Sequence, residues 1–296
     1  MKTNYTSTGL VIFFLLILYS FSAKPQSIPT VPEGFKVSEY ASSNLLSNPV
    51  AISFDDFGRL YVAEAHRKNT GVWGVTFSRW WAMEDYQSST LEEREAMYDR
   101  WSHIVSRQKM ESKSELVRIL LDEDLDGKAD KSHIFADGFN NRLDGNAAGI
   151  LALGDKVLLA NIPHLWELRD QNQDNIAEIK NSLHKGFGVR VGVHGHDLHG
   201  LVQGPDGKIY FTVGDRGYDV INDQGIRFHE SHKGAVFRCL PDGSKLEVFH
   251  TGLRNPQELA FNDQGDLFTV DNNMSGGDER WILHLLQDGD SAWDAT

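Results

Sequence analysis

Four segments of the chain follow one pattern, and this repetition restricts the fold more than any other feature of the sequence. Each has a short apolar run, a tight turn with Asp or Gly, and a second run of β-branched or aromatic residues that ends in polar residues. The segments are 48–65, 147–162, 199–215 and 255–272. Apolar runs on either side of such a turn indicate a β-hairpin, so the sequence predicts the same hairpin four times.

Segments of similar design lie between these hairpins. They cover 116–139, 164–183 and 235–253, and each has two strand-like runs around a polar turn. Two hairpins in succession make a four-stranded unit, and such units of roughly 40 to 50 residues are typical of β-propeller blades. We therefore predict an all-β fold, a β-propeller with about four blades in this chain.

The first unit is longer than the others because it holds an extra segment, residues 68–112, that is rich in Trp, Met, Glu and Arg. Ser89 or Thr90, followed by Glu92 and Glu93, is the pattern of a helix N-terminus. We therefore predict a helical insertion after the first hairpin. Three of its tryptophans are expected to pack on the propeller or to line a substrate mouth: Trp80, Trp81 and Trp101.

The N-terminus has the layout of a secretory signal peptide. Lys2 precedes an apolar run at 9–19, and small residues follow at 20–23. The apolar run is shorter than the roughly 20 residues of a membrane span. We expect residues 1–23 to be a signal peptide and the protein to be periplasmic or secreted. The alternative is an uncleaved N-terminus that associates the protein with the membrane.

The C-terminus is also informative about the predicted fold. A propeller buries its strand edges by closing on itself. Nothing after Asp294 could return to pair with the first strand. We therefore expect Thr296 to be a truncated end and 30–296 to be a partial propeller domain.

Charge and cysteine content exclude two possibilities. The chain has 29 Lys and Arg against 42 Asp and Glu, a formal net charge of −13, which repels phosphate groups and excludes nucleic acid as a partner. The single cysteine, Cys239, excludes an intramolecular disulfide. Its place in the alternating run AVFRCL predicts a buried structural thiol.

Two polar turns carry oxygen ligands on alternate residues. The first turn contains Asp122, Asp124 and Asp126, with Asp130 after it, and the second contains Asp170, Asn172 and Asp174, with Glu178 after it. Calcium favours such alternating carboxylates and amides. Neither turn has the EF-hand spacing to a terminal Glu. A peripheral calcium site and a solvated acidic turn therefore both stay open.

Three histidines, His194, His196 and His199, lie just ahead of a strand-like run. The spacing allows a metal site, a general base at the mouth of the fold, or histidines that only bind loop backbone. In propellers, functional groups gather on loops next to the innermost strands. His196, Arg254 and Asn273 occupy such positions. A cation beside a base suits hydride abstraction from an alcohol carbon or the binding of a polyanionic cofactor, and a structural ion pair of Arg254 is the alternative.

Three motifs in order carry a resemblance to a known family. HGHDLHGLVQGPDGKIYFTVGD, GLRNPQELAFNDQGDLFTV and DNNMSGGDE resemble the soluble PQQ-dependent glucose/sorbosone dehydrogenase superfamily, and most closely its exported membrane-bound dehydrogenase group of β-propeller quinoproteins. The resemblance implies a six-bladed propeller that binds pyrroloquinoline quinone (PQQ) and calcium over its axis. It also implies oxidation of a sugar or other alcohol by hydride transfer to PQQ, with an electron acceptor such as a cytochrome c.

The resemblance also implies roles for four residues. His196 matches the base that takes the proton of the substrate hydroxyl. Arg254 and Asn255 match residues over the quinone carbonyls, where a cation stabilises the reduced quinone. Asn146 matches a polar contact to the cofactor.

The implied calcium site lies in the third motif. Asn273 and Met274 match a loop whose backbone carbonyls hold the ion, although the family has Gly-Pro there. Gly195 stands where the family often has an acidic residue. The basic residues that grip the quinone carboxylates lie in later blades of the family. His194 and His199 have no catalytic counterpart and are expected to be supporting or structural.

Two other functions stay open. One is a calcium-dependent propeller hydrolase such as a lactonase, in which His196 helps to activate water at the metal. The other is a non-catalytic propeller that binds carbohydrate or protein, because a fold does not fix a function. Hydrolases of this class normally have acidic metal ligands around the axis, whereas the axial candidates here are His, Arg and Asn, which favours the dehydrogenase.

Overall fold

The computed structural model describes residues 29–76, 78–192, 195–272 and 280–294. The chain separates into two compact units, Met1–Glu39 and Tyr40–Thr296, and the second holds every described helix and strand. The predicted signal peptide lies outside the described residues. Among those residues, no helix has the length and apolar character needed to span a membrane.

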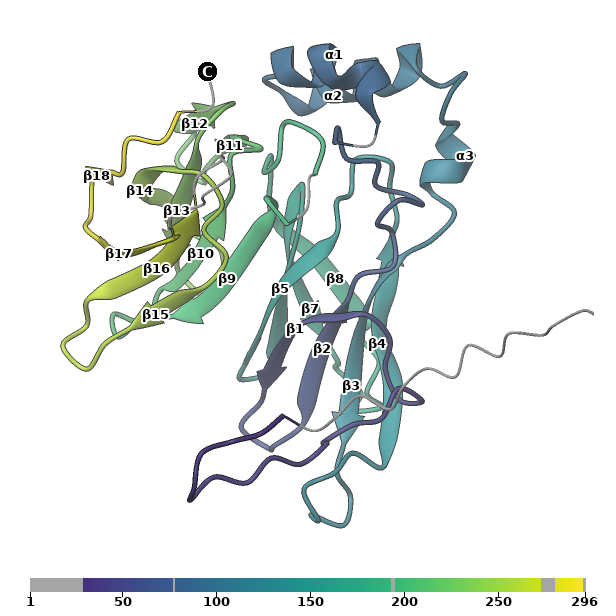
Figure 1. The fold of residues 1–296 in the computed structure, drawn as a ribbon, viewed down its shortest axis with the longest axis vertical. Helices are drawn as coiled ribbons and strands as arrows, with labels where there is room; N and C mark the ends of the chain where they lie inside the picture. The colour runs from purple at the N-terminus through teal and green to yellow at the C-terminus, as the bar shows by residue number, and fades with distance from the viewer. Residues whose placement is uncertain (1–28, 77, 193–194, 273–279, 295–296) are drawn as a thin grey trace, which may run out of the picture. The chain divides into compact units, whose positions relative to one another are not determined.

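The first two blades are four-stranded antiparallel sheets whose strands follow one another in sequence order (Figure 1). Blade 1 consists of β1 (Pro49–Phe54), β2 (Leu60–Glu64), β3 (Glu115–Leu121) and β4 (Lys131–Phe139). Blade 2 consists of β5 (Ala147–Leu153), β6 (Lys156–Asn161), β7 (His164–Arg169) and β8 (Ile179–Lys185). The predicted hairpins and their partner segments form these strands.

The third and fourth blades repeat the design with variations. Blade 3 consists of β9 (Leu198–Gln203), β10 (Ile209–Val213), β13 (Gly234–Cys239) and β14 (Glu247–Leu253), and the short β18 (Gly289–Asp290) pairs in parallel with β14. A separate hairpin, β11 (Tyr218–Ile221) and β12 (Arg227–Glu230), extends between β10 and β13. Blade 4 has three described strands, β15 (Leu259–Phe261), β16 (Leu267–Asn272) and β17 (Arg280–Leu285). The predicted propeller of four blades is confirmed.

The hairpin turns show why the repeat is visible in the sequence. Gly58, Gly207 and Gly265 have φ angles of 79°, 78° and 88°, which favour glycine. In the first turn, the Asp55 carboxylate accepts hydrogen bonds from the N–H groups of Phe57 and Arg59. These local requirements recur at each turn, so they recur in the sequence.

The hydrophobic core lies between neighbouring blades. Phe187, Phe211 and Phe237 pack together between blades 2 and 3, with the Phe187 and Phe211 ring centroids 5.5 Å apart. Cys239 is buried in the same cluster, as predicted. Burial raises the pKa of its thiol to about 12, so the thiol stays protonated and unreactive.

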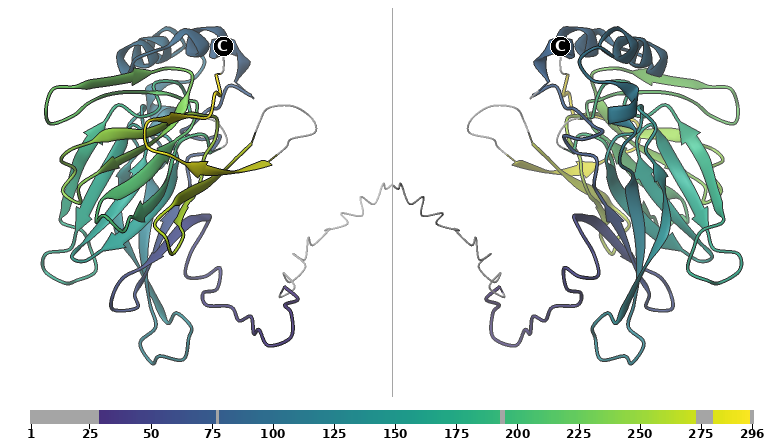
Figure 2. Two further views of the ribbon diagram at one scale, coloured as in Figure 1. Left: turned by 90° about the vertical axis from the view of Figure 1, so that its left-hand side faces the viewer. Right: turned by 90° about the vertical axis from the view of Figure 1, so that its right-hand side faces the viewer.

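The insertion between β2 and β3 is helical, as predicted. It contains the 3-10 helix η1 (Arg79–Trp81) and the helices α1 (Ala82–Gln87), α2 (Leu91–Arg100) and α3 (Arg107–Met110). The Thr90 hydroxyl accepts a hydrogen bond from the Glu93 N–H and so caps α2, and the Glu93 carboxylate accepts one from the Ser89 N–H just before the cap. Trp81 is buried among the insertion and blade residues. Figures 1 and 2 show these helices at one end of the blades.

Candidate functional site

Each blade has a buried polar side chain where its second strand ends. The four are Glu64, Asn161, Asp215 and Asp271. In the first two blades this side chain fixes the backbone of the loop that leads into the first strand. Glu64 accepts a hydrogen bond from the Ser47 N–H at 2.6 Å, and Asn161 donates one to the Gly145 carbonyl at 2.9 Å. These bonds satisfy backbone groups of the loop and fix its position.

In blade 4, the corresponding side chain also hydrogen-bonds loop backbone, on the loop that carries two predicted site residues. The Asp271 carboxylate accepts hydrogen bonds from the N–H groups of Arg254 and Asn255, both at 2.8 Å. The Arg254 carbonyl in turn accepts a hydrogen bond from the Asp215 N–H at 2.7 Å. The loops of blades 3 and 4 are therefore joined at the point where the candidate residues lie.

In blade 3, the polar side chain at the end of the second strand has different partners. Its carboxylate, Asp215, makes no hydrogen bond to loop backbone in the part of the chain that the structure describes. Instead, Asp215 Oδ1 is 2.9 Å from Nδ1 of His196, which lies on the loop leading into β9. The imidazole and the carboxylate are 12% and 5% exposed, so the pair is largely shielded from water. Glu64 of blade 1 also bonds an imidazole, that of His66, but in addition to its backbone contact.

Arg216 completes the surroundings of the Asp215 carboxylate. Its Nη2 and Nε lie 2.9 and 3.1 Å from Asp215 Oδ1. Burial raises the pKa of Asp215, but the hydrogen bond from His196 and the charge of Arg216 outweigh it and hold the pKa well below its usual range. Asp215 is therefore an ionised acceptor, and His196 must donate from Nδ1. The lone pair of the neutral imidazole is then at Nε2.

Two further residues of the histidine motif lie beneath His196. The Asp197 side chain is 1% exposed, and neither of its oxygens has a hydrogen-bond partner among the described residues. Burial raises its pKa, and His199 and His196 oppose the rise. His199 is buried, and its Nδ1 and Nε2 contact the carbonyls of Ala148 and Gly195. His194 lies outside the described residues.

Asn146 lies on the loop that leads into β5. Its side-chain oxygen and that of Asn255 are buried and have no hydrogen-bond partner among the described residues. Both predicted cofactor contacts thus present an unused acceptor on a loop at the same end of the blades. Buried acceptors are normally paired, so we expect a water molecule or a bound ligand to donate hydrogen bonds to these two oxygens.

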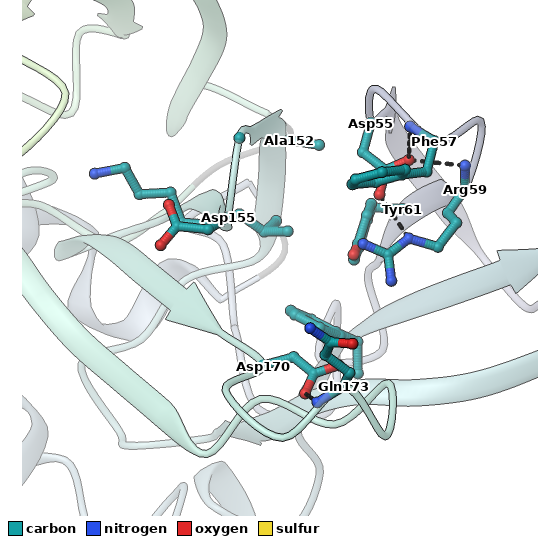
Figure 3. A pocket seen from close by; sticks show the side chains of 12 residues that line it. Asp55, Phe57, Arg59, Tyr61, Ala152, Asp155, Asp170 and Gln173 are labelled. Atoms are coloured by element: carbon teal, nitrogen blue, oxygen red, sulfur yellow. Dashed lines mark hydrogen bonds and ion pairs between the residues drawn. The ribbon is translucent and has the colours of Figure 1, made fainter.

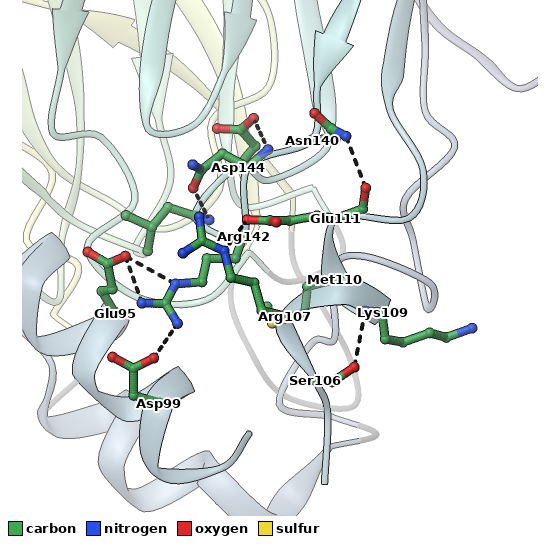
Figure 4. A network of polar contacts seen from close by, with 12 residues as sticks. Glu95, Asp99, Ser106, Arg107, Lys109, Met110, Glu111, Asn140, Arg142 and Asp144 are labelled. Carbon is green, nitrogen blue, oxygen red and sulfur yellow. Dashed lines mark hydrogen bonds and ion pairs between the residues drawn. The ribbon is translucent and has the colours of Figure 1, made fainter. Parts of the chain in front are cut away.

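The helical insertion holds the loop before Asn146 in place. The Arg142 guanidinium lies between Glu95, at 2.7 Å, and Asp99 of helix α2 (Figure 4). The Asn140 side chain donates to the Glu111 carbonyl at 2.9 Å, just after α3. The insertion therefore covers the end of the blades that carries the candidate site.

The Arg254 side chain borders a cavity of about 340 Å³. Its Nη1 donates to the Asn272 carbonyl at 3.3 Å, and its guanidinium carbon lies 5.6 Å from the ring centroid of Trp293. Asp271 and Trp281 also line the cavity. A guanidinium at the wall of a cavity can contact a bound anion or a developing negative charge.

The predicted metal ligands fall in two places. Asn273 and Met274 lie outside the described residues. Asp122, Asp124 and Asp126 bring their carboxylate oxygens within 4.8 Å of one another, in the turn between β3 and β4 at the opposite end of the blade from the insertion. The second acidic turn does the same with Asp170, Asp174 and Glu178.

Hydrogen bonds in the first acidic turn agree with both of its interpretations. Asp122 accepts from the Gly127 N–H at 2.9 Å, and Asp130 accepts from the Glu123 N–H at 2.8 Å. These bonds shape the turn whether or not an ion binds. The turn lies far along the blade from His196, so a calcium ion there would be peripheral.

A larger cavity, of about 440 Å³, lies among the turns at that same end, between blades 1 and 2 (Figure 3). Arg59 lies against the rings of Phe57 and Tyr61, and its Nε bonds Asp55 at 2.6 Å. Arg59 and Asp55, two of the charged groups of this cavity, are thus engaged with each other. It contains none of the residues predicted to be catalytic.

Comparison with known proteins places the chain in a family. A family model described as a domain of unknown function, DUF7133, matches residues 23–291. The chain belongs to the DUF7133 family. It is also 30% identical over 125 residues to quinoprotein glucose dehydrogenase B of Acinetobacter calcoaceticus, across 33% of this chain and 26% of that protein. The DUF7133 chain thus spans about a quarter of the length of this relative.

Solved structures share the fold. A Trichoderma reesei enzyme of carbohydrate-active family AA12 is 14% identical, with a TM-score of 0.51 over 90% of this chain and 58% of that one. The PQQ-bound aldose sugar dehydrogenase of Streptomyces coelicolor is 14% identical, with a TM-score of 0.48 over 82% of this chain and 61% of that one. The likeness to the Trichoderma reesei enzyme, at a TM-score of 0.51 and 14% identity, shows a common fold and nothing more.

Four residues of the site were not predicted from the sequence: Asp215, Arg216, Asp197 and Asp271. A signal for two of them was present, because Asp215 and Asp271 end the corresponding runs FTVGD and FTVDN. Comparing the repeats position by position would have marked both. Nothing local marks Arg216 or Asp197, whose roles depend on contacts between loops.

Proposed function

We propose that the protein is an exported oxidoreductase that oxidises a sugar or another alcohol by hydride transfer to PQQ. The match to a quinoprotein glucose dehydrogenase supports the class of chemistry. The sequence match covers only part of each chain, so support for the reaction itself must come from the residues around His196.

The observation that carries the proposal is the changed role of the polar residue in blade 3. In the other blades this residue fixes loop backbone, whereas Asp215 is committed to the imidazole of His196 and to Arg216. If Asp215 only stabilised the packing of the loops, it would not need to bond His196 and Arg216 in place of loop backbone. An imidazole oriented by an ionised carboxylate is the arrangement of a general base.

His196 would act through Nε2. With Nδ1–H donating to Asp215, Nε2 carries the lone pair and can take the proton from a substrate hydroxyl. The carboxylate then stabilises the imidazolium that forms, and the low exposure of the pair strengthens this attraction. Removal of the hydroxyl proton makes the neighbouring carbon a better hydride donor.

The residues at this end of the blades fit a polar cofactor that has both donor and acceptor groups. Asn146 and Asn255 present buried acceptor oxygens without partners among the described residues, and the guanidinium of Arg254, which can donate to an anion, borders a cavity. These three would hold the polar edge of PQQ, and Arg254 would stabilise negative charge on it. PQQ, when bound, supplies the hydride acceptor. Calcium at Asn273 and Met274 is proposed from the sequence resemblance alone.

The hydrolase alternative fits the site less well. A propeller hydrolase needs carboxylates free to hold a metal at the axis. Here Glu64, Asp215 and Asp271 are engaged by loop backbone, arginine or imidazole. Asp197 has no hydrogen-bond partner among the described residues, but a single carboxylate does not form such a metal site. We therefore favour the dehydrogenase.

The decisive experiment is reconstitution of the full-length protein with PQQ and calcium, followed by dye reduction with a panel of sugars and alcohols. We expect PQQ binding and a rate that His196→Ala abolishes. His133→Ala, on an exposed site of β4, is the matched control and should leave the rate unchanged. Absence of PQQ binding, or equal rates in wild type and His196→Ala, would overturn the proposal.

We also infer the setting of the reaction. Residues 1–23 are proposed as a signal peptide that directs the protein to the periplasm or outside, or that anchors it if uncleaved. A cytochrome c is the proposed type of electron acceptor. N-terminal sequencing of protein recovered from the periplasm tests the export route, and a start at Met1 would favour the anchored alternative.

Calcium at the acidic turn is a separate proposal. Bound calcium would raise the melting temperature of the protein, and Asp124→Asn would remove this effect by deleting one ligand charge. An unchanged melting temperature with added calcium would favour the solvated acidic turn.

A further inference from the structure

A line of alternating charges connects the helical insertion with His196. It begins at Asp85 of helix α1, a side chain that is 2% exposed. Asp85 Oδ1 accepts a hydrogen bond from the Val191 N–H at 2.6 Å, on the loop that leads toward β9. Asp85 Oδ2 lies 4.0 Å from Nη1 of Arg216. One carboxylate of the insertion thus contacts both the loop that precedes His196 and the arginine beside it.

Arg216 connects Asp85 with the Asp215–His196 pair. Its Nη2 is 2.9 Å from Asp215 Oδ1, and the same oxygen receives the Nδ1–H of His196 at 2.9 Å. Arg216 therefore lies between two carboxylates, one from the insertion and one from blade 3. All four side chains are mostly shielded from water, so charge–charge interactions among them are stronger than at the surface.

We propose that Asp85 is a positioning residue for His196, which it controls by fixing the orientation of Arg216 beside Asp215. This inference rests on the proposed role of His196 as the base. The helical insertion would then take part in the reaction, because it supplies Asp85.

The geometry explains why Asp85 is needed. Arg216 and His196 donate to the same oxygen of Asp215, so the orientation of the guanidinium decides how much of that oxygen is left for the imidazole. Asp85 attracts Nη1, on the other side of the guanidinium, and so fixes that orientation. Without Asp85, Arg216 is free to turn fully toward Asp215 and to compete with His196.

The charges around Asp85 favour its ionised form. Burial raises the pKa of this carboxyl, while Arg216, the Val191 N–H, Arg190 and Arg94 oppose the rise. Protonation of Asp85 would remove one negative charge from the neighbourhood of Arg216, Arg190 and Arg94 in a buried place, which is costly. On the other side of the line, Asp197 and His199 are further ionisable groups near His196 among the described residues.

The test compares Asp85→Asn with Glu84→Gln in the full-length protein. Asn keeps an oxygen for the Val191 N–H and removes the charge that faces Arg216. Glu84 is the neighbouring carboxylate on α1 and bonds Arg100 and Trp101 instead, so its variant is the matched control. The first measurement is the NMR signal of the His196 Nδ1–H, which requires no cofactor and no substrate.

We expect this signal in the wild type and in Glu84→Gln, and its loss to solvent exchange in Asp85→Asn. With PQQ bound, kcat/KM should fall about tenfold in Asp85→Asn, which lies within the roughly 100-fold loss that misplacement of a catalytic group can cause. In an Arg216→Gln background, Asp85→Asn should have no further effect. This double variant shows whether Asp85 acts through the arginine.

An unchanged Nδ1–H signal in Asp85→Asn would overturn the inference, as would a full tenfold loss in the Arg216→Gln background. If the protein neither binds PQQ nor reduces dye, the proposed function fails, but the NMR comparison still decides whether Asp85 positions His196. The two failures are thus distinguishable.

Discussion

Asp215 is the residue on which the candidate site depends most directly. It fixes the tautomer of His196 and receives two donors of Arg216 on one oxygen. Its neighbours hold its pKa well below the usual range. A substitution here changes the chemistry of the imidazole while leaving the strands of blade 3 intact.

Asp215→Asn is expected to lower kcat/KM by about 100-fold or more, since oriented general bases contribute on this order. The amide can present an N–H to His196 Nδ1 and so favour the wrong tautomer. Asp155→Asn is a suitable control because Asp155 is exposed in a turn at the other end of blade 2. Steady-state kinetics of the PQQ-loaded protein measure the effect, and a loss of less than twofold would contradict it.

Asp215 should also make the stability of the protein dependent on acid pH. The folded state keeps this carboxylate ionised below the pKa of about 4 that an unfolded Asp has. The unfolded state therefore binds more protons as the pH falls, and the free energy of unfolding decreases. The contribution is fully present above about pH 4 and is lost as the pH falls toward the folded pKa.

Urea unfolding between about pH 5 and pH 3 tests this dependence. Asp215→Asn should lose less stability than the wild type over that range, because its side chain does not titrate. Parallel curves for the two proteins would show that the pKa of Asp215 is not lowered in the folded state.

At the scale of elements, buried arginines join the helical insertion to the loops of the propeller. Arg94 of α2 donates to the carbonyls of Arg190 and Leu143. Arg67, at the start of the insertion, donates to the carbonyls of Asp144 and Met110. The insertion is thus attached through loop backbone at the end of the blades that carries the candidate site.

Arg94→Met is expected to destabilise the protein by about 2 kcal/mol or more, because two buried carbonyls lose their donor. Arg100→Met, on the exposed side of the same helix, is the matched control. It removes only a partly exposed ion pair with Glu84 and should cost less than about 1 kcal/mol. Chemical denaturation of both variants provides the comparison, and equal losses would contradict the anchoring role of Arg94.

At the scale of the whole chain, the first and fourth blades carry exposed apolar rows. Val50, Ile52 and Phe54 lie on one face of β1. Val270 and Ile282 are paired neighbours on β16 and β17. Contiguous exposed apolar side chains of this kind are typical of surfaces that contact another protein chain.

The chain of 296 residues should therefore self-associate through these rows. Ile282→Lys is expected to weaken the association by placing a charge on the row of blade 4. Leu125→Lys, in the exposed acidic turn, adds the same charge elsewhere and should leave it unchanged. Sedimentation velocity over a range of concentrations measures the effect, and a monomer at every concentration would contradict the prediction.

The hairpins, the helical insertion and the buried thiol were predictable because each depends on residues close together in the chain. Turns with Gly58 or Gly207 and the cap at Thr90 are local requirements, so they leave a local pattern. His196 and Arg254 could be selected for the same reason, since both lie in recognisable motifs next to inner strands.

The tertiary structure decided what these residues contact. Asp215 meets His196 only because β9 and β10 pair, and Asp85 meets Arg216 only because the insertion folds back over blade 3. Neither contact follows from spacing, because loops from different elements supply the partners. The sequence by itself therefore determined the repeated strands and the candidate base, whereas packing alone placed the charges that orient that base.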